Sequence, residues 1–277
     1  MIEIDVLRVA DVYAWLGCQA ITARHLGCDQ STVSRRSRQV SPLETLRSSL
    51  DQQTFLQLER QVHQLWRFRS GRDLRVHAFR WLNRPLQRQL PASWVANPME
   101  VSLTRIDPLE LLQRRVIDAL LAPWPLVADL DDTEFSLLPL YATPLLLLAP
   151  RDGLLSRETG LSGRDIARAS RLEALDFVPA TAVDCSRHLD AQLFGAVPLA
   201  ATDPSPDHRY WGTPLTPLVR TDLVPLAVQA PVSYSEFLVC RREWRDHAEI
   251  LRLQQAVSRT LELLPLDGVA RDQLAVA

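Results

Sequence analysis

Hydrophobic and polar positions alternate with a helical period over the first forty residues. Apolar side chains recur on one face of residues 5–15, and again on one face of residues 19–26. Gly27 suits a helix C-terminus, where a left-handed backbone is easiest for glycine, and Asp29 suits the N-cap of a third helix. The pattern predicts three short helices, the last two joined by a tight turn.

The third predicted helix is unusually polar. Val33 and Val40 are its clear apolar positions, so most of its surface faces away from a core. Glutamine, serine and threonine can bond base edges or phosphates, and arginine can do both. An ordinary solvated helix is the alternative interpretation. The candidate DNA-binding residues are Gln30, Ser31, Thr32, Ser34, Arg35, Arg36 and Arg38.

A long amphipathic segment follows from residue 42 to about residue 69. Ser41 can cap it, and Pro42 fits a first helical turn. Its apolar residues form a stripe close to a heptad repeat, which predicts a partner helix and hence a dimer. The alternative is that the stripe packs on its own protein. Besides Phe55, the stripe holds the candidate dimerisation residues Leu43, Leu46, Leu50, Leu58, Val62 and Leu65.

From Gly71 onward the pattern alternates between strands and helices. We predict strands at 74–79, 99–106 and 125–130, with helices at 83–90 and 108–122 between them. This order is typical of a parallel α/β sheet.

The second half of the chain leaves this sheet and returns to it. Residues 135–150 form a long apolar run, and residues 223–228 and 233–241 look like returning strands. Two crossings imply two lobes with a ligand cleft between them. The other predicted elements are helices at 163–171, 186–194 and 243–264 and a strand at 175–178.

Ligands of open α/β sheets bind beyond the carboxyl ends of the strands. Arg80 or Arg105 could there bind a carboxylate with two hydrogen bonds, although a surface arginine in contact with water is the alternative. The candidate effector-binding residues at these ends and at the expected hinge are Phe79, Arg80, Trp81, Ile106, Asp107, Ala128, Thr143 and Thr181.

The composition of the chain limits the classes of function that we expect. The 277 residues carry a net charge of −2, with arginine as every basic residue, so any DNA-binding charge is local. The four cysteines and six histidines are scattered without metal-ligand spacing, no catalytic motif is present, and no cofactor is expected. Acidic and basic residues interrupt the N-terminus, and the longest apolar stretch, 144–150, is too short to cross a bilayer. We therefore expect a cytoplasmic protein that is not an enzyme and has no membrane partner.

Two short runs carry a family resemblance. Thr22-Ala23-Arg24-His25-Leu26 and Gln30-Ser31-Thr32-Val33-Ser34-Arg35 resemble the helix-turn-helix of LysR-type transcriptional regulators. The resemblance implies a DNA-binding domain at 1–41, a linker helix at 42–70 that makes the dimer, and an effector-binding domain at 71–277. That domain would have the type 2 periplasmic-binding-protein fold, with lobe I at about 71–143 and 229–277 and lobe II at about 144–228.

The chain departs from this family where a β-wing normally follows the recognition helix. Here Val40 continues directly into Ser41-Pro42, so the wing is missing or cut to a turn. We expect a LysR-like regulator that binds double-stranded DNA as a dimer or tetramer and responds to a small-molecule effector. The alternative is a sensor or interaction protein whose degenerate helix-turn-helix no longer binds DNA specifically.

Overall fold

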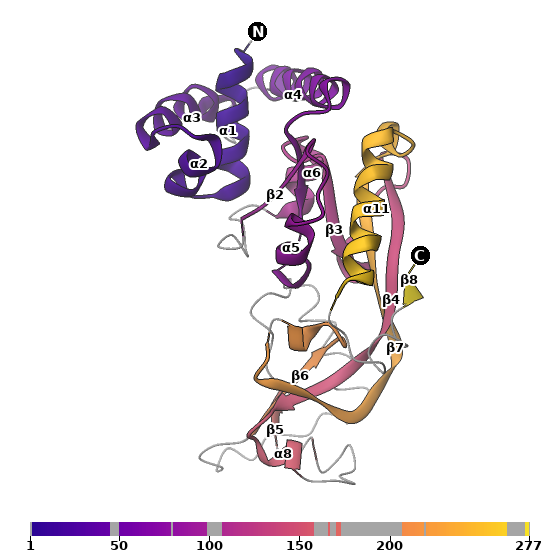
Figure 1. Cartoon of the computed structure of the whole chain (residues 1–277). Coiled ribbons are helices and arrows are strands. Elements are labelled where there is room, and N and C mark those ends of the chain that lie inside the picture. Colours follow the sequence, from indigo (N-terminus) through magenta and orange to yellow (C-terminus); the bar gives the residue numbers. More distant parts are fainter. Residues whose placement is uncertain are drawn as a thin grey trace.

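The computed structural model describes residues 2–44, 50–78, 80–98, 107–157, 166, 170–172, 207–218, 220–264 and 275–276. Its N-terminal part is helical, with α1 (Ile4–Leu16), α2 (Gln19–Leu26), α3 (Gln30–Glu44) and the long α4 (Leu50–Ser70). The first three helices form a headpiece, and α3 lies on its outer side, away from the sheet (Figure 1). The three predicted N-terminal helices are therefore confirmed.

Helix α3 is longer than the sequence pattern predicted. It continues through Ser41 and Pro42 to Glu44, so the predicted helix start at Pro42 is wrong. Proline removes one N–H donor, and close to the helix end this loss is tolerated. The next described helix begins at Leu50. The intervening residues 45–49 are too few for two strands and a turn.

A sheet follows with its first strands in parallel. Strand β1 pairs in parallel with β2 on one side and with β3 on the other. Helix α5 follows β1, and α6 and α7 flank β3. The bounds are β1 (Leu74–His77), α5 (Arg80–Gln87), β2 (Trp94–Ala96), α6 (Pro108–Gln113), β3 (Ala119–Pro123) and α7 (Trp124–Val127).

Two predicted elements of this region are wrong. The helix predicted over 108–122 ends at Gln113, and the chain turns through Arg115, whose φ is 58°, into strand β3. Strand β3 is buried at every residue, and a short apolar run of this kind cannot be assigned to helix or strand by period alone. The strand predicted at 125–130 is instead covered by α7 and a turn. The strand predicted at 99–106 lies outside the described residues.

Two long antiparallel strands connect the lobes. β4 (Phe135–Pro150) and β7 (Leu223–Arg241) pair along almost their full length. The C-terminal half of β7 also pairs with β3, and the C-terminal half of β4 pairs with β6 (Asp207–Gly212). The predicted outward and returning strands are confirmed, and they form the only sheet contact between the lobes in the described part of the chain (Figure 1).

The second lobe is described in part. β5 (Ser170–Leu172) pairs in parallel with β6, beside α8 (Leu154–Arg157) and a 3-10 turn, η1 (Thr216–Leu218). Residues 170–171 form strand where a helix to 171 was predicted. The helix predicted at 186–194 and the strand at 175–178 lie outside the described residues.

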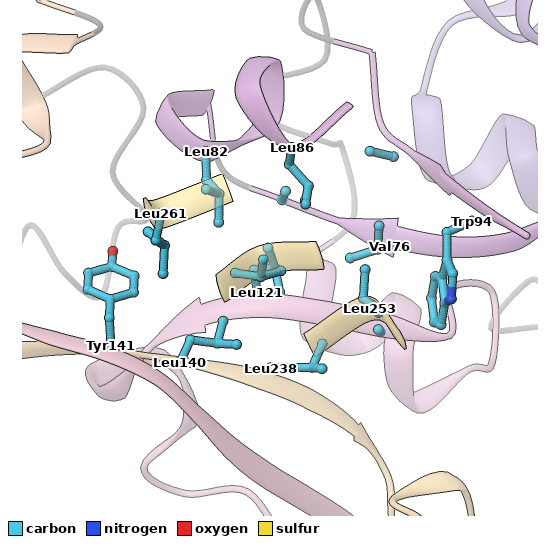
Figure 2. Close-up of a cluster of buried hydrophobic side chains, with 14 of the residues drawn as sticks. Val76, Leu82, Leu86, Trp94, Leu121, Leu140, Tyr141, Leu238, Leu253 and Leu261 are labelled. Carbon is cyan, nitrogen blue, oxygen red and sulfur yellow. The ribbon is translucent and has the colours of Figure 1, made fainter. Parts of the chain in front are cut away.

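The main core lies in the first lobe, between the sheet and α11 (Ala248–Glu262), which follows a 3-10 turn, η2 (Arg242–Trp244). Figure 2 shows Leu253 and Leu261 of α11 facing Leu121, Leu140 and Leu238 of the sheet. The closing helix predicted at 243–264 is thus confirmed, with a later start. The short β8 (Ala275–Val276) adds to β4 at Tyr141 and Ala142. No helix in the described ranges is long and apolar enough to cross a membrane.

Candidate nucleic-acid interface and effector site

The turn between α2 and α3 is closed by its own backbone. Gly27 has a φ of 64°, and its N–H bonds back to α2, while the N–H of Cys28 reaches the carbonyl of Ala23. On the other side, the carbonyl of Asp29 accepts from the N–H groups of Thr32 and Val33 and starts α3. These backbone bonds define the turn, and Val9 of α1 packs against Ala23 of α2 and Val33 of α3.

Helix α3 presents its polar side chains outward. Val33 and Val40 are the buried anchors, at 0% and 1% exposure, as the sequence predicted. Among the candidate DNA contacts, Gln30, Ser31, Arg35 and Arg38 are exposed, and Thr32, Ser34 and Arg36 are half-buried. Arg36 leans toward α1, where its Nη1 lies 3.5 Å from the carbonyl oxygen of Asp5. The exposed set thus lies on one side of α3, and three of its four members fall in the first two turns, the part that contacts bases in helix-turn-helix proteins.

The headpiece shares a core with the first lobe. Val12, Trp15 and Leu16 of α1 pack in one cluster with residues of α6 and β3. The indole N–H of Trp15 donates to Nδ1 of His77 on β1 at 3.2 Å. Burial lowers the pKa of His77 to about 4, so the imidazole is neutral and its Nδ1 can accept. Arg8 adds a half-exposed ion pair with Asp73 at 3.1 Å.

A buried ionic network holds α4 against the headpiece and the sheet. Arg60 bonds Asp11 of α1 through Nε at 2.9 Å and Nη2 at 2.8 Å. Arg67 grips Asp118 with two bonds, at 3.0 and 2.7 Å. Arg75 lies between the two carboxylates, and burial lowers its pKa to about 10. The inner face of α4 therefore combines these buried ion pairs with the buried apolar side chains of Leu56 and Phe68.

The outer face of α4 is apolar. Phe55, Leu58, Val62, Leu65 and Trp66 are 39%, 57%, 62%, 37% and 42% exposed. We call these five residues the α4 stripe. Leu58, Val62 and Leu65 were predicted from the sequence; Leu43 is half-buried, and nothing is described for the side chains of Leu46 and Leu50. A helix with a paired polar inside and a bare apolar outside is typical of a contact with another chain.

Few of the candidate effector residues can be placed. Phe79, Ile106 and Thr181 lie outside the described residues, and only the backbone of Arg80 and Trp81 is described, at the start of α5. Asp107 is exposed and caps α6 by accepting from the N–H of Leu109 at 2.8 Å. Ala128 is exposed after α7 rather than after a strand. Thr143 is buried in the middle of β4. Of the candidates whose side chains are described, Asp107, Ala128 and Thr143 lie at three different elements.

A different polar group lies at the crossing of the lobes. Tyr141 and Thr143 of β4 stand opposite Glu236 and Tyr234 of β7, so all four side chains leave the same face of the ladder. Glu236 is fully buried, and its Oε2 accepts from both tyrosine hydroxyls, that of Tyr234 at 3.3 Å. Burial raises the pKa of Glu236 to about 7, and burial beside Glu236 raises the pKa of Tyr141. The sequence analysis did not predict Glu236, although it is the single acidic residue of the returning segment 223–241, which was a usable signal.

No cluster of potential metal ligands is found among the described residues. Trp124 and Trp66 are exposed, but no group of acidic, histidine or cysteine side chains accompanies them in the ranges above.

Known proteins resemble the chain in structure but not in sequence. No family model matches it, and no curated protein matches it. The probable transcriptional regulator PA0477 from Pseudomonas aeruginosa is 17% identical with a TM-score of 0.50, over 91% of this chain and 97% of that one. A peroxide-bound mutant of OxyR from Corynebacterium glutamicum is 15% identical with a TM-score of 0.45, over 95% and 93%. The regulatory domain of MetR, a LysR family regulator from N. meningitidis, is 15% identical with a TM-score of 0.45, over 75% and 99%. At these identities the likeness concerns the fold alone. The order of N-terminal helices followed by a mixed α/β sheet agrees with the fold that the sequence predicted.

Proposed function

We propose that this protein is a LysR-like transcriptional regulator that binds double-stranded DNA through α3. The observation that carries the proposal is the division of α3 into two sides. Val33 and Val40 anchor one side in the headpiece, and exposed Gln30, Arg35 and Arg38 crowd the other. Arginine and glutamine are the side chains that bond guanine and adenine edges in the major groove.

The proposed DNA-binding function includes assembly of the protein into a dimer or tetramer. The α4 stripe supplies an apolar surface that a second copy would cover, and a twofold dimer would present two α3 helices to two half-sites. Binding to DNA would place the protein in the cytoplasm. A small-molecule effector bound between the lobes would modulate binding, because β4 and β7 can transmit a change in lobe orientation to the first lobe and its docked headpiece.

The experiment is a fluorescence anisotropy titration of DNA with the wild-type protein and with Arg35→Ala. If Arg35 reaches a base, its loss weakens binding by about 1–3 kcal/mol, mostly on the preferred sequence. Arg88→Ala is the matched control, because Arg88 is an exposed arginine just after the end of α5. Equal behaviour of the two variants would remove Arg35 from the interface.

The second candidate is a sensor or interaction protein whose helix-turn-helix has lost DNA binding. The observation that favours it is the five-residue connection between α3 and α4, which has no room for a wing and its phosphate contacts. Salt separates the two candidates. Specific binding through several arginines weakens with salt, with a slope of about −0.9 per phosphate neutralised.

A further inference from the structure

Two buried polar atoms at the crossing of the lobes have no hydrogen-bond partner in the described part of the chain: Oε1 of Glu236 and Oγ1 of Thr143. Glu236 is 0% exposed and Thr143 2%. Buried polar groups in native proteins are almost always paired, and each exception requires an explanation. Two exceptions on one face of the same pair of strands point to a missing partner.

The geometry limits what that partner can be. Thr143 stands opposite Tyr234, one step along the ladder from Glu236 opposite Tyr141. Thr143 and Glu236 are therefore diagonal neighbours, and the Cα atoms of such neighbours lie about 7–8 Å apart in a regular antiparallel pair. A small molecule can bridge such a span with a single polar group or with two groups close together.

The chemistry limits it further. An ionised carboxylate accepts hydrogen bonds and cannot donate, so its free oxygen needs a donor. Both known partners of Glu236 are neutral tyrosine hydroxyls, which leave its charge unbalanced. A carboxylate or phosphate ligand would be repelled here. The rings of Tyr141 and Tyr234, with centroids 6.1 Å apart, present electron-rich faces that attract an organic cation.

We propose that the effector of this protein carries a protonated amino group, which donates to Oε1 of Glu236 and to Oγ1 of Thr143 at the crossing of β4 and β7. This proposal rests on the proposed function only in that the ligand regulates DNA binding, since binding of the ligand itself needs no DNA. The site lies where the two strands pass between the lobes, on residues that the pairing of β4 and β7 already holds in register. Figure 2 shows Tyr141 of this group rising from β4 beside Leu261 of α11, at the edge of the main core.

The test uses three small salts on the full chain without DNA: n-butylammonium chloride, tetramethylammonium chloride and sodium butyrate at equal ionic strength. Isothermal titration gives affinity, and thermal unfolding gives the shift in midpoint. We expect butylammonium to bind and raise the midpoint. Tetramethylammonium can contact the tyrosine rings but has no N–H to donate, so it should bind more weakly than butylammonium. Butyrate, which carries a negative charge, should not bind.

Variants and pH then locate the site. Glu236→Gln should weaken butylammonium binding at least about tenfold, as expected for a charge-assisted bond, and Thr143→Val by less. Glu134→Gln, at an exposed glutamate that pairs with Arg241, should bind like wild type. Wild type should bind butylammonium more weakly at about pH 5.5 than at about pH 8.5. Burial raises the pKa of Glu236 to about 7, so its carboxyl is protonated and uncharged at the lower pH.

Several results would overturn the proposal: no binding of butylammonium, equal binding of butyrate or tetramethylammonium, or unchanged binding in a folded Glu236→Gln. If Glu236→Gln does not fold, affinity of the wild type that is equal at the two pH values overturns it instead. If the protein binds the amine but not DNA, the amine site is supported and the proposed function as a DNA-binding regulator is refuted. DNA binding without amine binding would do the reverse.

Discussion

Leu58→Asp on α4 should break the homo-oligomer. Leu58 lies in the middle of the α4 stripe and is 57% exposed, while the opposite face of the same helix is fixed by Arg60 and Arg67 in the buried ionic network. The substitution therefore changes the outer surface and leaves the contacts that hold α4 to its own protein in place.

The expected size follows from the exposed fraction. Complete burial of a leucine side chain contributes about 1.5–3 kcal/mol, so burial of the 57% that is exposed contributes roughly 0.9–1.7 kcal/mol per copy. A twofold interface buries two copies, which gives about 1.7–3.4 kcal/mol, or a dissociation constant about 20- to 300-fold weaker. A carboxylate forced into the interface adds its own desolvation cost, so these values are lower bounds.

Sedimentation velocity over a range of concentrations measures the effect. Wild type should sediment as a dimer or tetramer, and Leu58→Asp as a monomer at concentrations where wild type is assembled. Gln57→Asp is the matched control, since Gln57 is exposed and lies about a quarter-turn away from the stripe. An unchanged mass for Leu58→Asp would show that the α4 stripe does not form the interface.

Two further predictions concern stability. Asp118→Asn should cost about 3–5 kcal/mol in urea unfolding, because Asp118 accepts four hydrogen bonds and its loss strands buried Arg67; Asp222→Asn at an exposed pair should cost under about 1 kcal/mol. The pKa of His77 is lowered on folding, from 6.5 to about 4, so its contribution is present above pH 6.5 and is lost as pH falls from 6.5 through 4. His77→Gln should flatten this part of the stability profile, and an identical acid limb in both proteins would contradict the assignment.

The headpiece and the crossing strands were predictable because local pattern decided them. Gly27 and Asp29 mark the turn between α2 and α3, and Val33 and Val40 mark the buried side of α3. The crossing strand at 135–150 is a single apolar run whose prolines fall near irregularities of its pairing with β7. In each case neighbours along the chain supply the signal.

What was not predictable depends on distant partners. The apolar spacing across residues 114–123 fits a helix as well as a buried strand, and only pairing with β1 and β7 makes it β3. Arg60 and Arg67 pair with Asp11 and Asp118, which lie 49 and 51 positions away in the chain, so no local pattern predicts that these arginines are buried. Glu236 acquires its setting from Tyr141, 95 residues earlier.

The regulator hypothesis is tested most directly by titrating the wild-type protein with the DNA immediately upstream of its own gene and with an unrelated duplex, at two salt concentrations. We expect tighter binding to the upstream duplex, weakening steeply with salt at about −0.9 per phosphate contacted. Equal and weak binding to both duplexes would contradict sequence-specific recognition by α3.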